Sequence, residues 1–246
     1  MILQKKIVIF TSSLFGLKIY NYIKKYKKYR LHLVIPKKNK LLEKKIKELN
    51  ISKFEYYENL TKKNQLLKFK KLNFDLLISV YFNIILKKDI YKSVKKTINF
   101  HPSYLPHHKG CYPHVHAMLN GIGGGITFHQ IEKKIDSGKI WFQKKLSPKF
   151  MDTQDTFHNK LKNEMLKKFK QKFKSILHDN IKPKNQSSNG NYNNKNSLDK
   201  YDKLILNKNY KLNNLIQLLN ARIFKKKTFA YFIYKNKKFK VLMKIL

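Results

Sequence analysis

The sequence predicts an α/β fold: a Rossmann-like domain with a mostly parallel sheet, followed by a small C-terminal helix and β-hairpin appendage. Short apolar runs rich in Ile, Val and Leu alternate with stretches whose apolar residues recur at helical spacing. The first run ends in a small polar cluster, as strands of doubly wound sheets do where they turn into a helix. A chain of 246 residues is long enough for one sizeable core and an appendage.

The short apolar runs are interpreted as strands because they are rich in β-branched residues and bounded by polar or small ones. They lie at residues 6–10, 31–35, 54–57, 74–79, 97–100, 126–131 and 139–144. The last two are expected to pair as a hairpin around Asp136, Ser137 and Gly138, because these residue types favour turns.

Helical spacing of apolar residues predicts the helices. They lie at residues 15–26, 41–49, 64–71, 86–94, 113–120, 153–177 and 211–222. The longest can be capped by Asp152 or Thr153, and an apolar residue recurs every four positions from Phe157 to Leu177. We interpret this stripe as core packing.

The chain after the long helix is expected to divide into a linker and a small subdomain. Residues 183–197 are polar and rich in asparagine, which is typical of a linker. Residues 229–234 and 238–243 are predicted to be two further strands. We therefore expect a catalytic domain over residues 1–182 and a helix and hairpin subdomain over 198–246.

The formal charge of +41 raises the question of nucleic-acid binding. Of the 55 basic residues only Arg30 and Arg222 are arginines, and the lysines are spread along the chain. We interpret this as compositional bias and do not expect specific nucleic-acid binding. Such a surface should still attract anionic substrates, such as nucleotides or folates.

The single cysteine, Cys111, excludes a disulfide within the chain and suits a reducing cytoplasm, where we expect the protein to act. No apolar run approaches the ~20 residues that a membrane span needs. The N-terminal residues lead directly into a strand-like run, so we expect no signal peptide.

Three polar residues predict an acyl-transfer site. Asn99 and His101 lie at the end of an expected strand, and Asp136 follows 35 residues after His101 in an expected turn. An amide can donate to a developing oxyanion, an imidazole can move a proton near neutral pH, and a carboxylate can orient or charge that imidazole. Taken singly, Asn99 and Asp136 are also ordinary turn residues, and His101 is an ordinary polar residue before a proline.

Several other histidines raise the question of a metal site: His107, His108, His114, His116 and His129. Two of them, two residues apart on one expected helix, would point about 200° apart, which is poor for chelation. No acidic or cysteine partner has zinc-like spacing. We therefore expect no metal, and we interpret most of these histidines as surface or cleft residues.

Two ordered blocks of the sequence resemble the folate-dependent formyltransferase family. The first block is Asn99-x-His101-Pro102-Ser103-x-Leu105-Pro106, and the second comprises Gly125-Ile126-Thr127-x-His129 and Ile135-Asp136-Ser137-Gly138-x-Ile140-x-x-Gln143. The resemblance extends over roughly the first 180 residues. It implies N10-formyltetrahydrofolate as the formyl donor, with Asn99 donating to the oxyanion, His101 moving the proton of the attacking amine, and Asp136 assisting His101.

Three branches of this family differ in features that can be looked for in this sequence. Glycinamide ribonucleotide formyltransferases have a Gly-rich phosphate loop after the first strand, which residues 11–15 lack. Methionyl-tRNA formyltransferases have a larger C-terminal β-barrel, for which the residues from Pro183 onward are too few. Sugar N-formyltransferases can end in a short helix and hairpin, which residues 212–224 and the hairpin after them resemble. Residues 101–113 also look most like this branch.

The resemblance therefore implies formylation of a dTDP- or UDP-linked amino sugar, for lipopolysaccharide or other surface glycan biosynthesis. Two alternatives stay open. One is a formyltransferase for methionyl-tRNA or glycinamide ribonucleotide, and the other is a non-catalytic, basic RNA-binding protein on the same fold. In the sugar branch such hairpins can form a dimer interface, and residues 231–234 are apolar, so we expect a homodimer through the C-terminal hairpin.

The resemblance also implies binding residues on either side of the acyl-transfer site. The pterin is expected at the segment after the strand at 74–79 and at the loop before Asp136, namely at Phe82, Asn83, Ile84, Ile85 and Lys134. The nucleotide sugar is expected near Ser12, Ser13 and Lys109. The two serines are equally suited to cap a helix.

Overall fold

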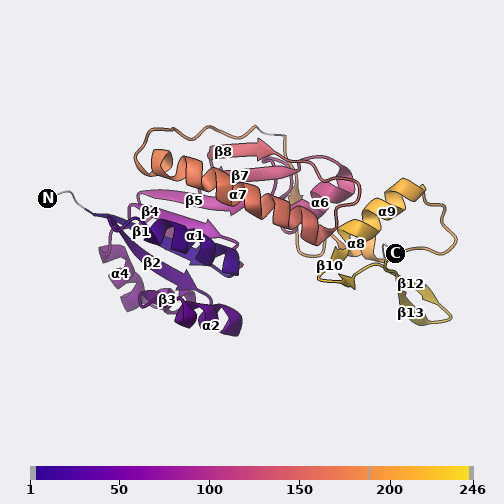
Figure 1. Ribbon diagram of the computed structural model, residues 1–246, viewed down its shortest axis with the longest axis horizontal. Coiled ribbons are helices and arrows are strands. Elements are labelled where there is room, and N and C mark those ends of the chain that lie inside the picture. The colour runs from indigo at the N-terminus through magenta and orange to yellow at the C-terminus, as the bar shows by residue number, and fades with distance from the viewer. Residues whose placement is uncertain (1–3, 188, 244–246) are drawn as a thin grey trace. The chain divides into compact units, whose positions relative to one another are not determined.

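The computed structural model describes residues 4–187 and 189–243. Seven strands form one sheet in the order β3-β2-β1-β4-β5-β7-β8 (Figure 1). Their bounds are β1 Lys5–Thr11, β2 Tyr29–Ile35, β3 Phe54–Tyr56, β4 Leu76–Val80, β5 Lys96–His101, β7 Gly125–His129 and β8 Ile140–Lys145. β1 pairs in parallel with β2 and β4, β2 with β3, and β4 with β5. The predicted α/β class, with a mostly parallel sheet, is confirmed.

The middle of the sheet is buried on both faces, which explains the continuous apolar runs. All five residues of β4 are buried, and Ile7 to Phe10 of β1 have no exposed surface. Such strands need helices on both faces of the sheet. After β1 the chain builds β2 and β3 on one side and then returns to place β4 on the other side of β1. The carboxyl ends of β1 and β4 therefore form a topological switch point, where doubly wound folds bind ligands.

Six of the seven predicted helices follow the predicted stretches closely. Their bounds are α1 Leu14–Lys24, α2 Lys40–Glu48, α3 Tyr57–Leu60, α4 Lys63–Lys71, α5 Lys88–Tyr91, α6 Pro113–Asn120, α7 Gln154–Leu177, α8 Asp199–Asp202 and α9 Leu212–Ala221. The apolar stripe of α7 is at most 1% exposed from Phe157 to Leu177, so its interpretation as core packing is confirmed. Ser13 caps α1 by accepting a hydrogen bond from the N–H of Gly16.

One predicted helix is much shorter in the structure, and several short elements were not predicted. The helix expected at residues 86–94 is only the single turn α5, because the side chain and N–H of Ser93 both bond the carbonyl of Ile90 and close the turn there. The unpredicted elements include α3, α8, and the two-residue strands β6 Lys109–Gly110, β9 Tyr192–Asn193, β10 Ile223–Phe224 and β11 Lys227–Thr228. Elements this short carry too few residues for a periodic pattern.

The chain folds as two compact units, each built from three segments. Of the described residues, unit 1 comprises 4–101, 128–142 and 166–185, and unit 2 comprises 102–127, 143–165, 186–187 and 189–243. The predicted boundaries at 182 and 197 stay a prediction. Within unit 2, β9 from the predicted linker pairs in parallel with β6, so this segment is part of a folded unit.

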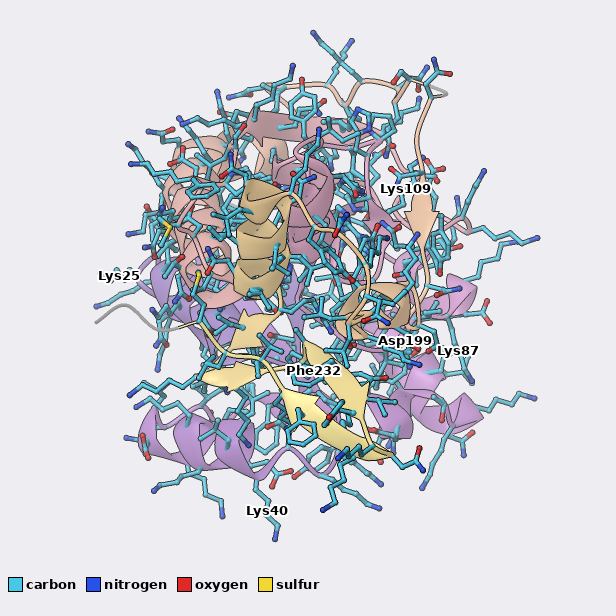
Figure 2. All side chains as sticks on the ribbon, turned by 90° about the vertical axis from the view of Figure 1, so that its right-hand side faces the viewer. Lys25, Lys40, Lys87, Lys109, Asp199 and Phe232 are labelled. Carbon is cyan, nitrogen blue, oxygen red and sulfur yellow. The ribbon has the colours of Figure 1, made fainter. Side chains whose placement is uncertain are left out.

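The C-terminal part of unit 2 forms the predicted helix and hairpin. The predicted strands at 229–234 and 238–243 correspond to β12 Tyr231–Tyr234 and β13 Lys237–Lys240, which pair antiparallel. The rings of Phe232 and Phe239 stack across the hairpin, with their centres 5.3 Å apart. Figure 2 shows Phe232 on this hairpin.

The surface carries the large positive charge of the chain. Figure 2 shows long side chains ending in nitrogen, among them Lys25 and Lys40, projecting from the ribbon into the surroundings. Within the described ranges, no helix is both long enough and apolar enough to span a bilayer.

Candidate active site

β5 brings an amide and an imidazole to the carboxyl edge of the sheet. Asn99 lies opposite Ser79 of β4, and His101 is the last residue of β5. Residues two apart in a strand point to the same side, so both side chains face the same way. His101 is 4% exposed, and Asn99 is half-buried. This edge is where parallel sheets place ligands.

A tight turn between β7 and β8 supplies the carboxylate. Asp136 has a left-handed backbone, with φ of +50°. At Gly138 a Cβ atom would lie 2.0 Å from the carbonyl oxygen of Gln130, so only glycine fits. The N–H of Gln130 donates to the carbonyl of Lys139 at 2.8 Å and closes the loop. The Asp-Ser-Gly sequence therefore fixes the direction in which Asp136 points.

The structure brings the three predicted catalytic residues together within unit 1. Oδ2 of Asp136 lies 3.4 Å from Nδ1 of His101, and Oδ1 of Asp136 lies 3.3 Å from Nδ2 of Asn99. The side chains of His101 and Asp136 are 5% and 10% exposed. Asp136 is thus placed to orient the imidazole and to balance the positive charge that forms when His101 takes up a proton.

A fourth residue, His129 at the end of β7, completes the cluster. Its Nδ1 lies 2.7 Å from the carbonyl oxygen of Gln130, so Nδ1 carries the hydrogen and Nε2 of the neutral ring accepts. That Nε2 lies 3.0 Å from Nδ2 of Asn99 and 3.3 Å from Oδ1 of Asp136. One amide hydrogen of Asn99 therefore points to His129 and the other to Asp136, which fixes the rotation of the amide.

His129 was not among the predicted site residues, although it stands inside the second sequence block. The available signal was its position two residues after Thr127 at the end of an apolar strand, the same placement that singled out His101. His129 is only 2% exposed, so it is not one of the surface histidines.

The same cluster offers a donor set for a metal ion. His101, His129 and Asp136 each present one ligand atom, and these atoms lie within 4.8 Å of one another. Two imidazoles and a carboxylate suit Zn²⁺ or a similar ion. The expectation that this protein uses no metal stays a prediction.

The segment predicted to hold the pterin follows β4 at the switch point. Phe82 and Ile84 are half-buried against the apolar cluster around Phe10, and the ring of Phe82 meets that of Phe10 edge-on, with centres 5.5 Å apart. Ile85 is 73% exposed, and its carbonyl accepts from the hydroxyl of Tyr57. Partly exposed aromatic and aliphatic surface of this kind fits a flat aromatic ring.

The remaining predicted binding residues are separated from one another. The hydroxyl of Ser12 accepts from the N–H of Asn83 at 3.1 Å, which groups Ser12 with the segment predicted for the pterin. Ser13 is the cap of α1. Lys134 is exposed in the loop before Asp136, and its carbonyl accepts from Ser137. Lys109 lies on β6 in unit 2 (Figure 2).

Three more of the five histidines, most of which were expected at the surface or in a cleft, are buried in unit 2, so the expectation of mostly surface positions was wrong. His108, His114 and His116 are 1%, 7% and 3% exposed. His114 stacks on His158 with ring centres 4.3 Å apart, and His116 stacks on His108 at 5.8 Å. The two histidines of α6 therefore have different partners, as the predicted divergence of their rings requires.

Burial keeps two of these imidazoles neutral. Loss of solvent, together with electrostatic repulsion from His108, Lys200 and Arg222, lowers the pKa of His116 to about 4. Burial, with a smaller effect of Lys162, lowers the pKa of His158 to about 3. These rings are therefore uncharged at neutral pH.

Comparison with known proteins gives one family. The model of the Formyl transferase family matches residues 5–172. A methionyl-tRNA formyltransferase from Ehrlichia ruminantium is 38% identical over 96 residues, which are 38% of this chain and 32% of that protein. The chain thus matches about a third of the length of that curated relative.

Two solved structures share the fold over nearly the whole chain. A 4-N formyltransferase from Francisella tularensis superposes with a TM-score of 0.86 and 23% identity, covering 99% of this chain and 98% of that one. An N-formyltransferase from Helicobacter canadensis in complex with folinic acid and dTDP-3-aminofucose gives 0.76 and 20%, covering 95% and 86%.

Proposed function

Because this chain belongs to the Formyl transferase family, we propose that it moves a formyl group from N10-formyltetrahydrofolate to the amine of a nucleotide-linked amino sugar. The observation that carries the proposal is the gathering of Asn99, His101 and Asp136 at one buried position. An amide donor, a proton acceptor and a carboxylate are what formyl transfer to an amine requires.

In the proposed reaction the neutral amine attacks the formyl carbon. A bond forms from the amine nitrogen to that carbon, and the bond from the carbon to N10 of the folate breaks. Negative charge develops on the formyl oxygen, where one amide hydrogen of Asn99 is donated. His101 accepts the proton that the amine loses, and the leaving nitrogen takes up a proton.

The order of hydrogen bonds suggests how Asn99 becomes available. Its contact with His129 is 3.0 Å and its contact with Asp136 is 3.3 Å. An oxyanion would compete most easily for the hydrogen that faces Asp136, while His129 keeps the amide in place. Oδ2 of Asp136, 3.4 Å from Nδ1 of His101, would then balance the charge of that ring as it becomes positive.

We assign Phe82, Asn83, Ile84, Ile85 and Lys134 to the folate, and Ser12, Ser13 and Lys109 to the sugar nucleotide. The apolar surface of Phe82 and Ile84 at the switch point supports the folate side. Because Ser12 contacts Asn83 and Ser13 caps α1, Lys109 is the stronger candidate for the sugar nucleotide. The sugar branch is supported by the likeness in fold, over 95% of this chain, to an N-formyltransferase in complex with folinic acid and dTDP-3-aminofucose.

We also propose that the product serves a surface glycan and that the protein is a homodimer through β12 and β13. Ile233, Tyr234 and Phe239 of this hairpin are 43%, 52% and 42% exposed, so they form apolar surface that a second copy of the chain would cover. Light scattering should give twice the mass of one chain for the wild type and a single chain for Ile233→Lys. A monomeric wild type would contradict the dimer.

The function is tested by turnover on a panel of acceptors. The purified protein is incubated with N10-formyltetrahydrofolate and dTDP- or UDP-linked 3- and 4-amino sugars, and tetrahydrofolate release and product mass are followed. His101→Ala should lower the rate by about 10²–10⁴, and His178→Ala, which replaces an exposed histidine, should not. Turnover on methionyl-tRNA or glycinamide ribonucleotide alone would refute the sugar acceptor. The 38% identity to a methionyl-tRNA formyltransferase makes that tRNA the first alternative.

A further inference from the structure

His101, His129 and Asp136 form a cluster whose chemistry goes beyond proton transfer. Among residues 4–187 and 189–243, they are the only group of three or more histidine, cysteine, aspartate or glutamate side chains whose ligand atoms all lie within 4.8 Å of one another. All three residues belong to unit 1, so the cluster is complete within one unit. Two imidazoles and one carboxylate are a ligand set of zinc sites that keep a fourth position open.

The spacing of the ligand atoms fits a tetrahedral ion. Zn²⁺ binds imidazole nitrogen and carboxylate oxygen at about 2.0–2.2 Å, so neighbouring ligands of a tetrahedral site lie about 3.3–3.6 Å apart. Oδ1 of Asp136 lies 3.3 Å from Nε2 of His129, and Oδ2 of Asp136 lies 3.4 Å from Nδ1 of His101. Because the terminal torsion of an aspartate side chain is broad, the carboxylate can turn one oxygen toward an ion between the two rings.

Contacts around the cluster hold two of its members as a metal site requires. A histidine that binds a metal usually donates its other ring N–H to a carbonyl or carboxylate, which fixes the ring and its tautomer. Nδ1 of His129 donates in this way to the carbonyl of Gln130 at 2.7 Å, which leaves the lone pair of Nε2 directed toward Asp136. Asp136 is fixed by the tight turn in which Gly138 admits no side chain. Both ligands are therefore oriented before an ion arrives, which favours binding.

Burial and ligand type make the cluster selective among cations. The side chains of His101, His129 and Asp136 are 5%, 2% and 10% exposed, so an ion that enters gives up most of its water. Zn²⁺ accepts imidazole ligands in exchange, whereas Mg²⁺ dehydrates reluctantly and prefers six oxygen ligands. The single carboxylate balances only one of the two charges of Zn²⁺, in a chain with 55 basic and 14 acidic residues. We therefore expect weaker binding than at a dedicated structural zinc site.

Asn99 is the group that an entering ion has to displace. Its Nδ2 lies 3.0 Å from Nε2 of His129 and 3.3 Å from Oδ1 of Asp136, so its amide hydrogens point at two of the ligand atoms. An ion bound to those atoms takes the place of both hydrogens. The contacts that hold Asn99 as an oxyanion donor therefore compete directly with a metal ion, and the catalytic arrangement and the metal-bound arrangement exclude each other.

We propose that His101, His129 and Asp136 bind Zn²⁺ and that the bound ion reversibly inhibits formyl transfer. Coordination engages the carboxylate of Asp136, so it no longer balances a positive imidazole, and it turns the amide of Asn99 away from the formyl oxygen. The inhibition rests on the proposed function, whereas the binding of the ion is argued from the cluster alone. An inhibitory ion is compatible with the expectation that the reaction itself uses no metal.

Calorimetric titration with ZnCl₂ tests the site without folate or acceptor. The protein is used without an affinity tag or chelator, and it should bind Zn²⁺ with a Kd in the micromolar range and Mg²⁺ at least about 100-fold more weakly. His129→Ala removes one ligand and should weaken Zn²⁺ binding by at least about tenfold. Co²⁺ gives a second measurement, because a tetrahedral Co²⁺ site absorbs visible light strongly. That absorption should be lost in His129→Ala.

Asn99→Ala should change the affinity in the opposite direction. Without the amide hydrogens that compete for His129 and Asp136, Zn²⁺ should bind about threefold to tenfold more tightly. A gain in affinity cannot come from a disordered cluster, so this variant separates loss of a ligand from loss of the fold. Unchanged circular dichroism of both variants is the accompanying check.

Matched controls remove histidines that lie beside a single carboxylate. Nε2 of His32 lies 2.8 Å from Oε1 of Glu55 in unit 1, and the exposed His178 is followed by Asp179. Across the described part of the chain, neither histidine belongs to a group of three ligands. His32→Ala and His178→Ala should therefore keep the Zn²⁺ affinity of the wild type.

Turnover then measures the inhibition. With N10-formyltetrahydrofolate and an acceptor from the panel above, Zn²⁺ at ten times its Kd should lower the rate by about tenfold, as its occupancy of the site requires. Excess EDTA should restore the rate, and Mg²⁺ at the same concentration should leave it unchanged.

Two results would overturn the zinc site: equal Zn²⁺ affinity in the wild type and His129→Ala, or equal affinity of the wild type for Zn²⁺ and Mg²⁺. The outcomes also separate the two proposals. If Zn²⁺ binding depends on His129 but no acceptor is formylated, only the proposed function falls. If an amino sugar is formylated at a rate that saturating Zn²⁺ does not lower, only the proposed inhibition falls.

Discussion

Acidification should destabilise the protein through His116, which is 3% exposed and lies in a positively charged setting. Burial and the nearby His108, Lys200 and Arg222 lower its pKa to about 4 in the folded state. In the unfolded chain the pKa of a histidine is about 6.5. As the pH falls, the unfolded chain therefore binds the proton before the folded chain does. The free energy of unfolding is not lowered by His116 above pH 6.5, and it falls progressively as the pH drops from 6.5 toward 4.

The size of this effect follows from the two pKa values. At pH 5 an imidazole with a pKa of about 6.5 is about 97% protonated, and one with a pKa of about 4 is about 10% protonated. The difference in proton binding lowers the free energy of unfolding by about 2 kcal/mol at pH 5, compared with about 0.2 kcal/mol at pH 7. His158, whose pKa is about 3, should add a similar loss.

The assay is urea unfolding at a series of pH values between 7 and 5, followed by far-ultraviolet circular dichroism because both units contain helices. His116→Gln cannot take up the proton, so its free energy of unfolding should fall by about 2 kcal/mol less than that of the wild type over this range. His178→Gln removes an exposed imidazole and is the matched control. Its pH dependence should equal that of the wild type.

The comparison uses the change with pH in each protein, so a uniform destabilisation of His116→Gln at all pH values does not affect it. Parallel curves for His116→Gln and the wild type between pH 7 and 5 would refute the reasoning. A loss in His178→Gln equal to that in His116→Gln would refute it as well, because burial would then have no part in the effect.

Three further predictions concern named side chains. Asn99→Ala should lower kcat for formyl transfer by about 10²–10³ with unchanged circular dichroism, and a loss below tenfold would contradict its role as an oxyanion donor. His129→Phe removes the acceptor that holds the Asn99 amide, so kcat should fall about tenfold or more with little change in KM for the acceptor. An unchanged kcat would mean that Asp136 alone orients the amide. Asp152→Ala should cost about 2–3 kcal/mol of unfolding free energy, because this carboxylate is 5% exposed and accepts from Lys160 and Thr156. A loss below 1 kcal/mol in urea unfolding would contradict that role.

Local patterns were sufficient to predict most of the fold. The strand at β4 and the stripe of α7 are visible in the sequence because burial on both faces, or on one helical face, leaves a regular apolar pattern. The turn at Asp136 was also predictable, because Gly138 fits a place where any side chain would clash. In each case the signal is a set of residue types that are adjacent or regularly spaced in the sequence.

Contacts between distant residues were not visible in the sequence. His108 is buried because Asn191 and Asn193, more than 80 residues later, bond its backbone and ring. His129 joins Asn99 across 30 residues, through the neighbouring ends of two strands. The neighbouring sequence looks the same whether a polar side chain is hydrogen-bonded to a distant residue or to water. The burial of these histidines could therefore be recognised only from the tertiary structure.

The division of the chain into interleaved units constrains how the protein can form on the ribosome. The N-terminal 101 residues emerge first, yet their unit also needs residues 128–142 and 166–185. Its last segment carries the second half of α7, whose Phe169 and Phe173 contact Tyr22 of α1. At synthesis rates of about 5–20 residues per second, the early sheet therefore waits several seconds for its covering helix. During that interval the apolar residues that this helix covers lack their partner.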